Sequence, residues 1–109
     1  MRWTGPPDEA LPHVVAEVYR QTADPHVRQF AIGRTDDPVA AFIQLRQTLQ
    51  PPPIQMVILY EVGSADAART VERALRRLFQ RDPRYRSLPT PGQRSKKPPY
   101  QYVYIVLWD

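Results

Sequence analysis

The chain has 109 residues, a net charge of +4 and 42% hydrophobic residues that include two Trp and six Tyr, which together indicate one folded domain with a modest core. It has no cysteine, which excludes disulfide-bonded scaffolds and thiolate zinc sites and makes the cytoplasm the expected location. No apolar run is long enough to cross a bilayer, and the N-terminal residues lack a signal-peptide core, so we expect no association with a membrane.

The first third of the chain is predicted to contain an arm and two strands. Residues 1–12 have the composition of a loose arm that Trp3 could pin to the domain. Residues 13–19 (HVVAEVY) are rich in β-branched and aromatic side chains, and every second position carries a small apolar residue, as on one face of a strand. After a short turn, residues 27–32 form a second strand, most simply the hairpin partner of the first.

A glycine turn and a capped helix follow. Gly33 is expected in a tight turn, because glycine adopts backbone angles that are closed to other residues. Asp36 or Asp37 can cap the helix, and Pro38 then falls at the first helical position, where its missing N–H costs nothing. The helix ends before the three prolines at 51–53. Its apolar face is predicted to contain Val39, Phe42, Leu45 and Leu49.

The second half is predicted to begin with the central strand of the sheet. Residues 54–62 (IQMVILYEV) are the most strand-like run, and their near-continuous apolar character fits burial on both faces. Ser64 or Asp66 can cap the next helix, which spans residues 65–81 and turns its arginines away from its apolar side. The apolar stripe of this helix is predicted to contain Ala68, Val71, Leu75, Leu78 and Phe79.

A long loop and a last strand complete the predicted fold. Residues 82–99 form a basic, proline-rich loop, and residues 100–108 (YQYVYIVLW) form the C-terminal strand. Alternation puts Tyr100, Tyr102 and Tyr104 on one face of this strand, either in the core or as a surface on which bases could stack. The predicted fold class is α+β, with a small mixed or antiparallel sheet and the order strand, strand, helix, strand, helix, strand.

The two halves of the chain differ in charge. Residues 1–66 carry five basic and eight acidic side chains, whereas residues 67–108 carry ten basic and two acidic ones. A basic region set against an acidic one indicates an anionic partner, although arginines on a helix can also form a plain solvated face. The basic residues predicted to contact nucleic acid are Arg34, Arg69, Arg73, Arg76, Arg77, Arg81, Arg84, Arg86, Arg94, Lys96 and Lys97.

Three short motifs follow one another along the predicted elements. The letters EVY at 17–19 end the first predicted strand, AIGRTDDP at 31–38 leads into the first helix, and VERAL at 71–75 lies in the second helix. In order and content they resemble the GIY-YIG nuclease superfamily, and more closely its small phage and bacterial branch with a YKIGRT-DP signature. The resemblance covers residues 14–81, about two-thirds of the chain, and implies a GIY-YIG-like core over residues 13–81.

The resemblance also implies a degenerate catalytic site. It assigns Tyr19 to the first tyrosine of the family and Glu72 to the glutamate that binds one Mg or Mn ion. The second tyrosine and the arginine of the family are replaced here by Ala31 and Ala41, so the means of stabilising developing charge is missing. Tyr19 and Glu72 are therefore relic candidates. Packing of Tyr19 and an ion pair between Glu72 and Arg76 are their structural alternatives.

The function predicted from these observations is a basic nucleic-acid-binding module that resembles a GIY-YIG domain without most of its catalytic residues. It is expected to be a binding protein rather than an enzyme and to need no cofactor. Two alternatives remain open at this point. One is a small regulatory protein that binds an acidic protein surface. The other is a residual metal-dependent nuclease, which would use Mg or Mn.

Overall fold

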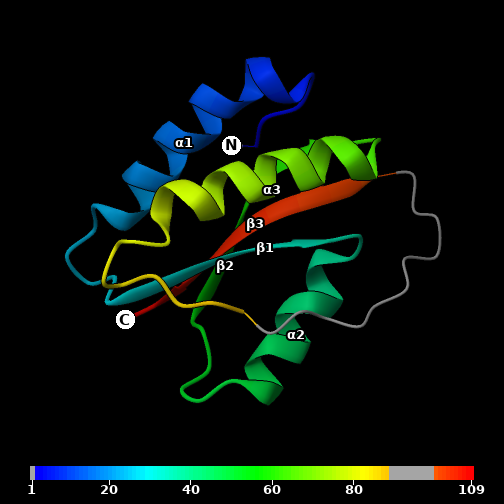
Figure 1. Cartoon of the computed structure of the whole chain (residues 1–109). Helices are drawn as coiled ribbons and strands as arrows, with labels where there is room; N and C mark the ends of the chain where they lie inside the picture. The colour runs from blue at the N-terminus through cyan, green and yellow to red at the C-terminus, as the bar shows by residue number, and fades with distance from the viewer. Residues whose placement is uncertain (1, 89–99) are drawn as a thin grey trace.

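The computed structural model of the protein describes residues 2–88 and 100–109. These residues form an α+β domain with three helices and a three-stranded antiparallel sheet (Figure 1). In chain order the elements are α1 (Pro7–Thr22), β1 (Gln29–Thr35), α2 (Pro38–Thr48), β2 (Gln55–Val62), α3 (Ala65–Phe79) and β3 (Gln101–Trp108).

Helix α1 corrects the prediction for the N-terminal third of the chain. It covers both the predicted arm from residue 7 onward and the strand predicted at residues 13–19. Its buried apolar residues Ala10, Val14 and Val18 are four positions apart, which is the spacing of one helix face. The strand prediction is wrong because Val14 and Val18 fit both a period of two and a period of four. Packing against the rest of the domain selects the helix.

The sheet has β3 at its centre, in the order β1-β3-β2, and both neighbours run antiparallel to it. Ile105 of β3 lies opposite Ile32 of β1 on one side and opposite Val57 of β2 on the other. Two predictions are therefore wrong: β2 is an edge strand rather than the central one, and β1 does not pair in a hairpin with residues 13–19. Both β2 and β3 are apolar runs, so their sequences alone do not reveal which one is central.

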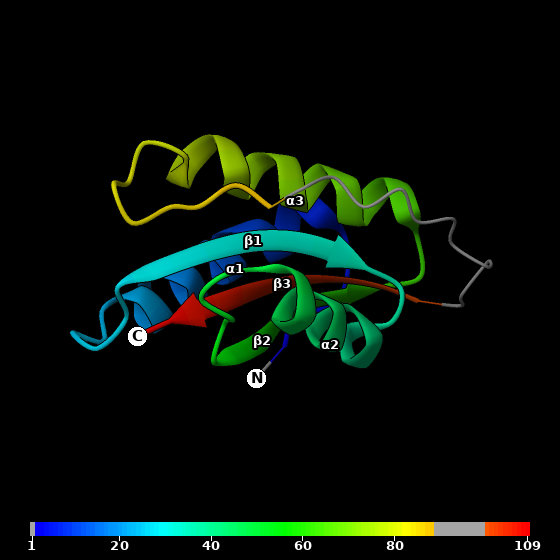
Figure 2. The same ribbon diagram turned by 90° about the horizontal axis from the view of Figure 1, so that it is seen from below.

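The helices cover opposite faces of the sheet. Figures 1 and 2 show α1 and α3 on one face and α2 on the other. The cluster under α1 and α3 contains the sheet residues Phe30, Ile32, Leu59, Val103, Ile105 and Leu107. The cluster on the α2 side contains Ala31, Leu45, Leu88, Tyr104, Val106 and Trp108. Alternate residues of β3 thus enter the two clusters in turn, as the pleat of a strand requires.

The caps and ends of α2 agree with the sequence. The Asp37 side chain accepts a hydrogen bond from the Ala40 N–H at 3.1 Å, and Pro38 occupies the first helical position. The helix ends at Thr48, before the prolines. These predictions are confirmed because caps and prolines act through the local backbone, independently of the rest of the fold.

Gly33 does not form the predicted turn. It lies inside β1, opposite Tyr104 of β3, and Gly5 is the described glycine with a positive φ, of 104°. A Cβ atom on Gly33 would lie 2.5 Å from Cζ and 2.9 Å from Cε1 of Tyr104. Glycine is therefore needed at position 33 to make room for the tyrosine ring, and not for its backbone conformational freedom.

Two segments outside the sheet border its edges. The backbone N–H of Trp3 donates to the Leu59 carbonyl at 2.9 Å and the Glu61 N–H donates to the Trp3 carbonyl at 2.8 Å, which confirms that Trp3 pins the N-terminal segment. At the other edge, the segment that follows α3 exchanges backbone hydrogen bonds with Phe30 of β1. This second contact brings the basic residues after α3 close to β1.

Candidate nucleic-acid interface

Helix α3 carries four arginines, more basic side chains than any other helix or strand that the structure describes. The Ser64 hydroxyl caps it by accepting a hydrogen bond from the Ala67 N–H at 3.2 Å. Ala68, Val71, Leu75 and Phe79 are buried against the sheet and α1, as predicted. Leu78, predicted for the same stripe, is 56% exposed, and the helix ends at Phe79 rather than at residue 81. The buried stripe fixes which side of α3 faces solvent.

Three arginines of α3 and one just beyond its end form a set that we call the arginine row and define as Arg69, Arg73, Arg77 and Arg81. They recur every four residues, so those within the helix are about 6 Å apart along its axis. Arg69 forms an ion pair with Asp66 at 2.8 Å. Among the residues that the structure describes, no side-chain hydrogen bond or ion pair engages Arg73, Arg77 or Arg81, all of which are exposed. The positive charge of these three side chains is therefore available to a partner.

Glu72 lies beside this row between two arginines. Its carboxylate pairs with the Arg34 guanidinium of β1 at 3.4 Å and with that of Arg76, one turn further along α3, at 3.1 Å. Only 12% of the Glu72 side chain is exposed. Arg76 also donates to the Ile32 carbonyl at 3.4 Å, which ties α3 to β1, and its buried Nε has no acceptor among the described residues.

This arrangement favours the ion-pair interpretation of Glu72 over metal binding. The sequence alone indicated Arg76 as the partner of Glu72. The fold adds a second partner, Arg34 of β1, which lies 38 positions before Glu72 in the chain. Two guanidinium groups next to one carboxylate leave a net positive charge, which opposes the approach of a divalent cation. Among the described residues, no group of three or more acidic, His or Cys side chains could hold a metal ion.

Tyr19 is separate from Glu72. It lies in α1, not at the end of a strand, and its ring contacts the edge of Phe79 with a centroid distance of 5.0 Å. Phe79 is seven residues after Glu72 on α3, or about 10 Å along the helix axis. The side chain of Tyr19 is nevertheless 61% exposed. The contact with Phe79 supports the packing alternative, and the fold does not join Tyr19 and Glu72 in one site.

Two of the predicted binding residues have structural partners. Arg84 pairs with Asp82 at 3.1 Å, donates to the Thr22 carbonyl at 2.6 Å, and lies over the Phe30 ring. Arg86 lies over the Trp108 ring, 4.9 Å from its centroid. Both arginines hold the segment after α3 against the domain and are only partly exposed. The predicted contacts of Arg94, Lys96 and Lys97 lie outside the described residues.

The pair of Asp82 and Arg84 is expected to make stability depend on acid pH. Hydrogen bonds from the side chain and backbone of Arg84 hold the pKa of Asp82 below its usual value. The resulting stabilisation is complete above the unfolded pKa of about 3.9 and is lost as the pH falls through the lower folded pKa. We expect Asp82→Asn to flatten the acid side of the stability curve in urea titrations at successive pH values. Parallel curves for the two proteins would contradict this role.

The tyrosines of β3 divide between core and surface. Tyr104 is buried on the α2 side, and burial raises its pKa to about 12, so its phenol is neutral near pH 7. Tyr102 is half-buried with Arg2 over its ring, and Tyr100 is exposed. The core interpretation is therefore correct for Tyr104. Sequence reasoning missed its approach to Gly33, since the pairing of β1 with β3 carries no local signal.

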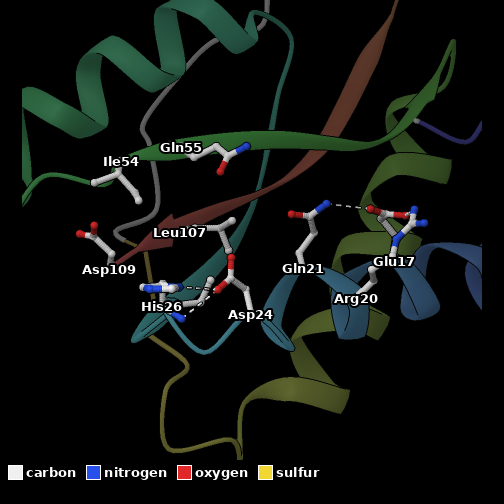
Figure 3. Close-up of a pocket in the computed structure, with 10 residues that line it drawn as sticks. Glu17, Arg20, Gln21, Asp24, His26, Ile54, Gln55, Leu107 and Asp109 are labelled. Carbon is white, nitrogen blue, oxygen red and sulfur yellow. Dashed lines mark hydrogen bonds and ion pairs between the residues drawn. The ribbon is translucent and has the colours of Figure 1, made fainter.

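A polar groove of about 510 Å³ lies between the C-terminal end of α1 and the adjoining ends of β2 and β3 (Figure 3). Two of its carboxylates, those of Glu17 and Asp24, already have donors within the chain. Glu17 accepts from Arg20 and from the Gln21 amide, and Asp24 accepts from the backbone N–H of His26 at 2.9 Å. The Gln21 hydrogen bond and the Arg20 charge lower the pKa of Glu17. This groove has no set of convergent groups that indicates a ligand.

No protein-family model, curated protein or solved structure matches the chain. The likeness to GIY-YIG nucleases thus stays a prediction, and its first motif, at residues 17–19, lies in α1 rather than in a strand. Within the described residues, no helix is both long and apolar enough to span a membrane. The functional argument accordingly depends on the geometry of α3 and its neighbours.

Proposed function

We propose that this domain binds nucleic acid through the outward side of α3. The observation that supports the proposal is the arginine row, in which Arg73, Arg77 and Arg81 are exposed and have no acidic partner among the described residues. Arginine side chains bind phosphate oxygens through charge-assisted hydrogen bonds and release condensed counterions when they do so. Several such side chains about 6 Å apart suit a polymer that carries one phosphate per nucleotide.

The proposed contacts are with the backbone of the nucleic acid rather than with its bases. Contacts to phosphates fix the position of a protein on nucleic acid and carry no sequence information. The arginine row contains no Asn or Gln, the side chains that pair with adenine, and its arginines are proposed to bind phosphates. We therefore propose binding with little sequence preference.

The proposal is for a binding module and not for a nuclease. Glu72, the residue that would hold a metal ion, is engaged by Arg34 and Arg76. Ala31 and Ala41, at the positions of two catalytic residues in the resembled family, are buried apolar residues. A carboxylate between two guanidinium groups, and alanines in place of the family's second tyrosine and arginine, give little basis for phosphodiester cleavage.

An acidic protein surface is the second candidate partner. The large side chains of Tyr19 on α1 and Leu78 on α3 are exposed, and Leu78 directly follows Arg77 of the arginine row. Mixed surfaces of arginine and large apolar side chains are typical of protein interfaces. A protein partner would give a weaker salt dependence than nucleic acid and would not be displaced by added oligonucleotide.

Binding of short labelled single- and double-stranded DNA and RNA over a salt series tests the proposal. With three phosphate contacts, the logarithm of the association constant should fall with log salt with a slope of about −2.7 on duplex DNA. Addition of Mg or Mn should produce no cleavage. A flat salt dependence, or no binding at about 50 mM salt, would overturn the proposal in favour of the protein partner. Metal-dependent cleavage lost in Glu72→Ala would support the nuclease instead.

A further inference from the structure

Arg34 is oriented by Glu72 but keeps most of its hydrogen-bonding capacity. A guanidinium group has five N–H donors. In Arg34 the Nε–H donates to the Glu72 carboxylate at 3.4 Å, and the terminal N–H groups have no acceptor among the described residues. The side chain is 32% exposed. Its terminal edge has two parallel N–H groups, one from each Nη, and no described residue engages them.

The charge at this cluster is not balanced. Arg76 pairs with the same carboxylate from α3 and is anchored by the Ile32 carbonyl, so it satisfies the structural need for one cation beside Glu72. Arg34 supplies a second positive charge that a structural ion pair does not require. A pre-positioned side chain with an unneutralised charge loses little conformational entropy when it binds an anion.

We propose that Arg34 is a phosphate anchor, whose terminal N–H groups bind two oxygens of one phosphodiester, with Glu72 as its positioning residue. The planar fork of arginine matches the oxygens of a phosphate, and lysine cannot reproduce this geometry. The inference rests on the proposed function, because it adds a phosphate contact on the β1 side of α3 to the contacts proposed for the arginine row. Figure 2 shows β1 alongside α3 on this side.

The first test compares Arg34→Gln with Arg46→Gln, which removes the same charge from the exposed face of α2 on the other side of the sheet. The probe is a labelled 20-nucleotide DNA, single- or double-stranded, whichever binds the wild-type protein more tightly. We expect Arg34→Gln to weaken binding about 5- to 10-fold and to reduce the salt slope by the value for one phosphate contact, about 0.9 on duplex or about 0.7 on single-stranded DNA. Arg46→Gln should change affinity less than 2-fold. Arg34→Lys, which keeps the charge without the fork, should give an intermediate affinity.

The second test asks whether Glu72 acts through Arg34. A double-mutant cycle compares the effect of Arg34→Gln in the wild-type, Glu72→Ala and Asp66→Ala backgrounds. Without Glu72 the anchor is no longer held, so the effect of Arg34→Gln should shrink to less than 3-fold. It should remain 5- to 10-fold without Asp66, an exposed carboxylate on the same helix. Glu72→Gln, which keeps the shape and one acceptor oxygen, repeats the cycle if Glu72→Ala lowers the melting temperature.

The outcomes separate this inference from the proposed function. If the wild-type protein binds with a steep salt dependence but Arg34→Gln and Arg46→Gln have equal effects, the anchor is overturned and binding through the arginine row stands. If the effect of Arg34→Gln is the same in all backgrounds, the positioning role of Glu72 is overturned. If the wild-type protein binds no oligonucleotide, the proposed function fails, and the anchor fails with it.

Discussion

Reversing the charge of Arg73 and Arg77 together to Glu is expected to weaken nucleic-acid binding about 100-fold at low salt. Each replacement removes one charge-assisted contact, worth roughly 1.5 kcal/mol, and such a loss corresponds to about tenfold in affinity. Repulsion between the new carboxylates and phosphates adds to the loss. Both side chains are exposed and have no hydrogen-bonding partner among the described residues, so the fold should be retained. Fluorescence anisotropy with a labelled oligonucleotide measures the effect.

The matched control reverses Arg28 and Arg46, which changes the net charge by the same amount. Arg28 lies just before β1 and Arg46 lies on α2, and both side chains are exposed. Neither belongs to α3. We expect the control to lose less than tenfold in affinity, and thermal melts of both variants check that they are folded. Equal losses in the two variants would show that overall charge, rather than the arginine row, determines binding.

The choice of Arg73 and Arg77 depends on the structure. From the sequence alone, Arg76 belongs with them as one exposed helical face. In the fold it is half-buried between Glu72 and the Ile32 carbonyl. A glutamate in its place would lie against Glu72 and leave the β1 carbonyl without this donor. A loss of binding in such a variant could then come from unfolding, which would make the experiment uninformative.

The sequence predicts the elements whose signals are local. Asp37 and Ser64 cap α2 and α3, Pro38 starts α2, and the apolar runs of β2 and β3 lie where they were expected. These signals act over a few residues and do not depend on what packs against them. Helix α1 is different, because its valines favour a strand by intrinsic preference. The local helix signals of α1, Pro7 at its start and Asp8 and Glu9 in its first turn, act together with the packing of its buried face to make it a helix.

The candidate site shows the same division between local and distant information. That α3 turns arginines outward follows from its apolar stripe, and this part of the site is predictable. Which arginines are available depends on partners from distant positions, such as the Ile32 carbonyl for Arg76 and the Thr22 carbonyl for Arg84. The EVY motif at 17–19 is the clearest case in which a short sequence motif misleads, because its three residues match a strand motif but lie in a helix.

Gly33→Ala is expected to lower the free energy of unfolding by about 2–3 kcal/mol, the upper part of the range for overpacking a core. The new methyl group would lie 2.5 Å from Cζ of the buried Tyr104 ring. The ring cannot simply rotate away, because Tyr104 is enclosed with Val106 and Leu45 on the α2 side of the sheet. Urea denaturation measures the loss, which should appear as a lower midpoint with an unchanged slope.

Tyr104→Ala supplies the control for this prediction. By itself it should destabilise the protein by about 3–5 kcal/mol, as expected when a large aromatic side chain is removed from a core. In that background the space over Gly33 is open, so adding Gly33→Ala should cost less than about 0.5 kcal/mol, or should stabilise β1, because alanine loses less backbone entropy than glycine in a strand. The difference between the two backgrounds is the coupling between positions 33 and 104. An equal cost in both backgrounds would mean that glycine is needed here for its backbone conformation, as the sequence first suggested, and not for the approach of the tyrosine ring.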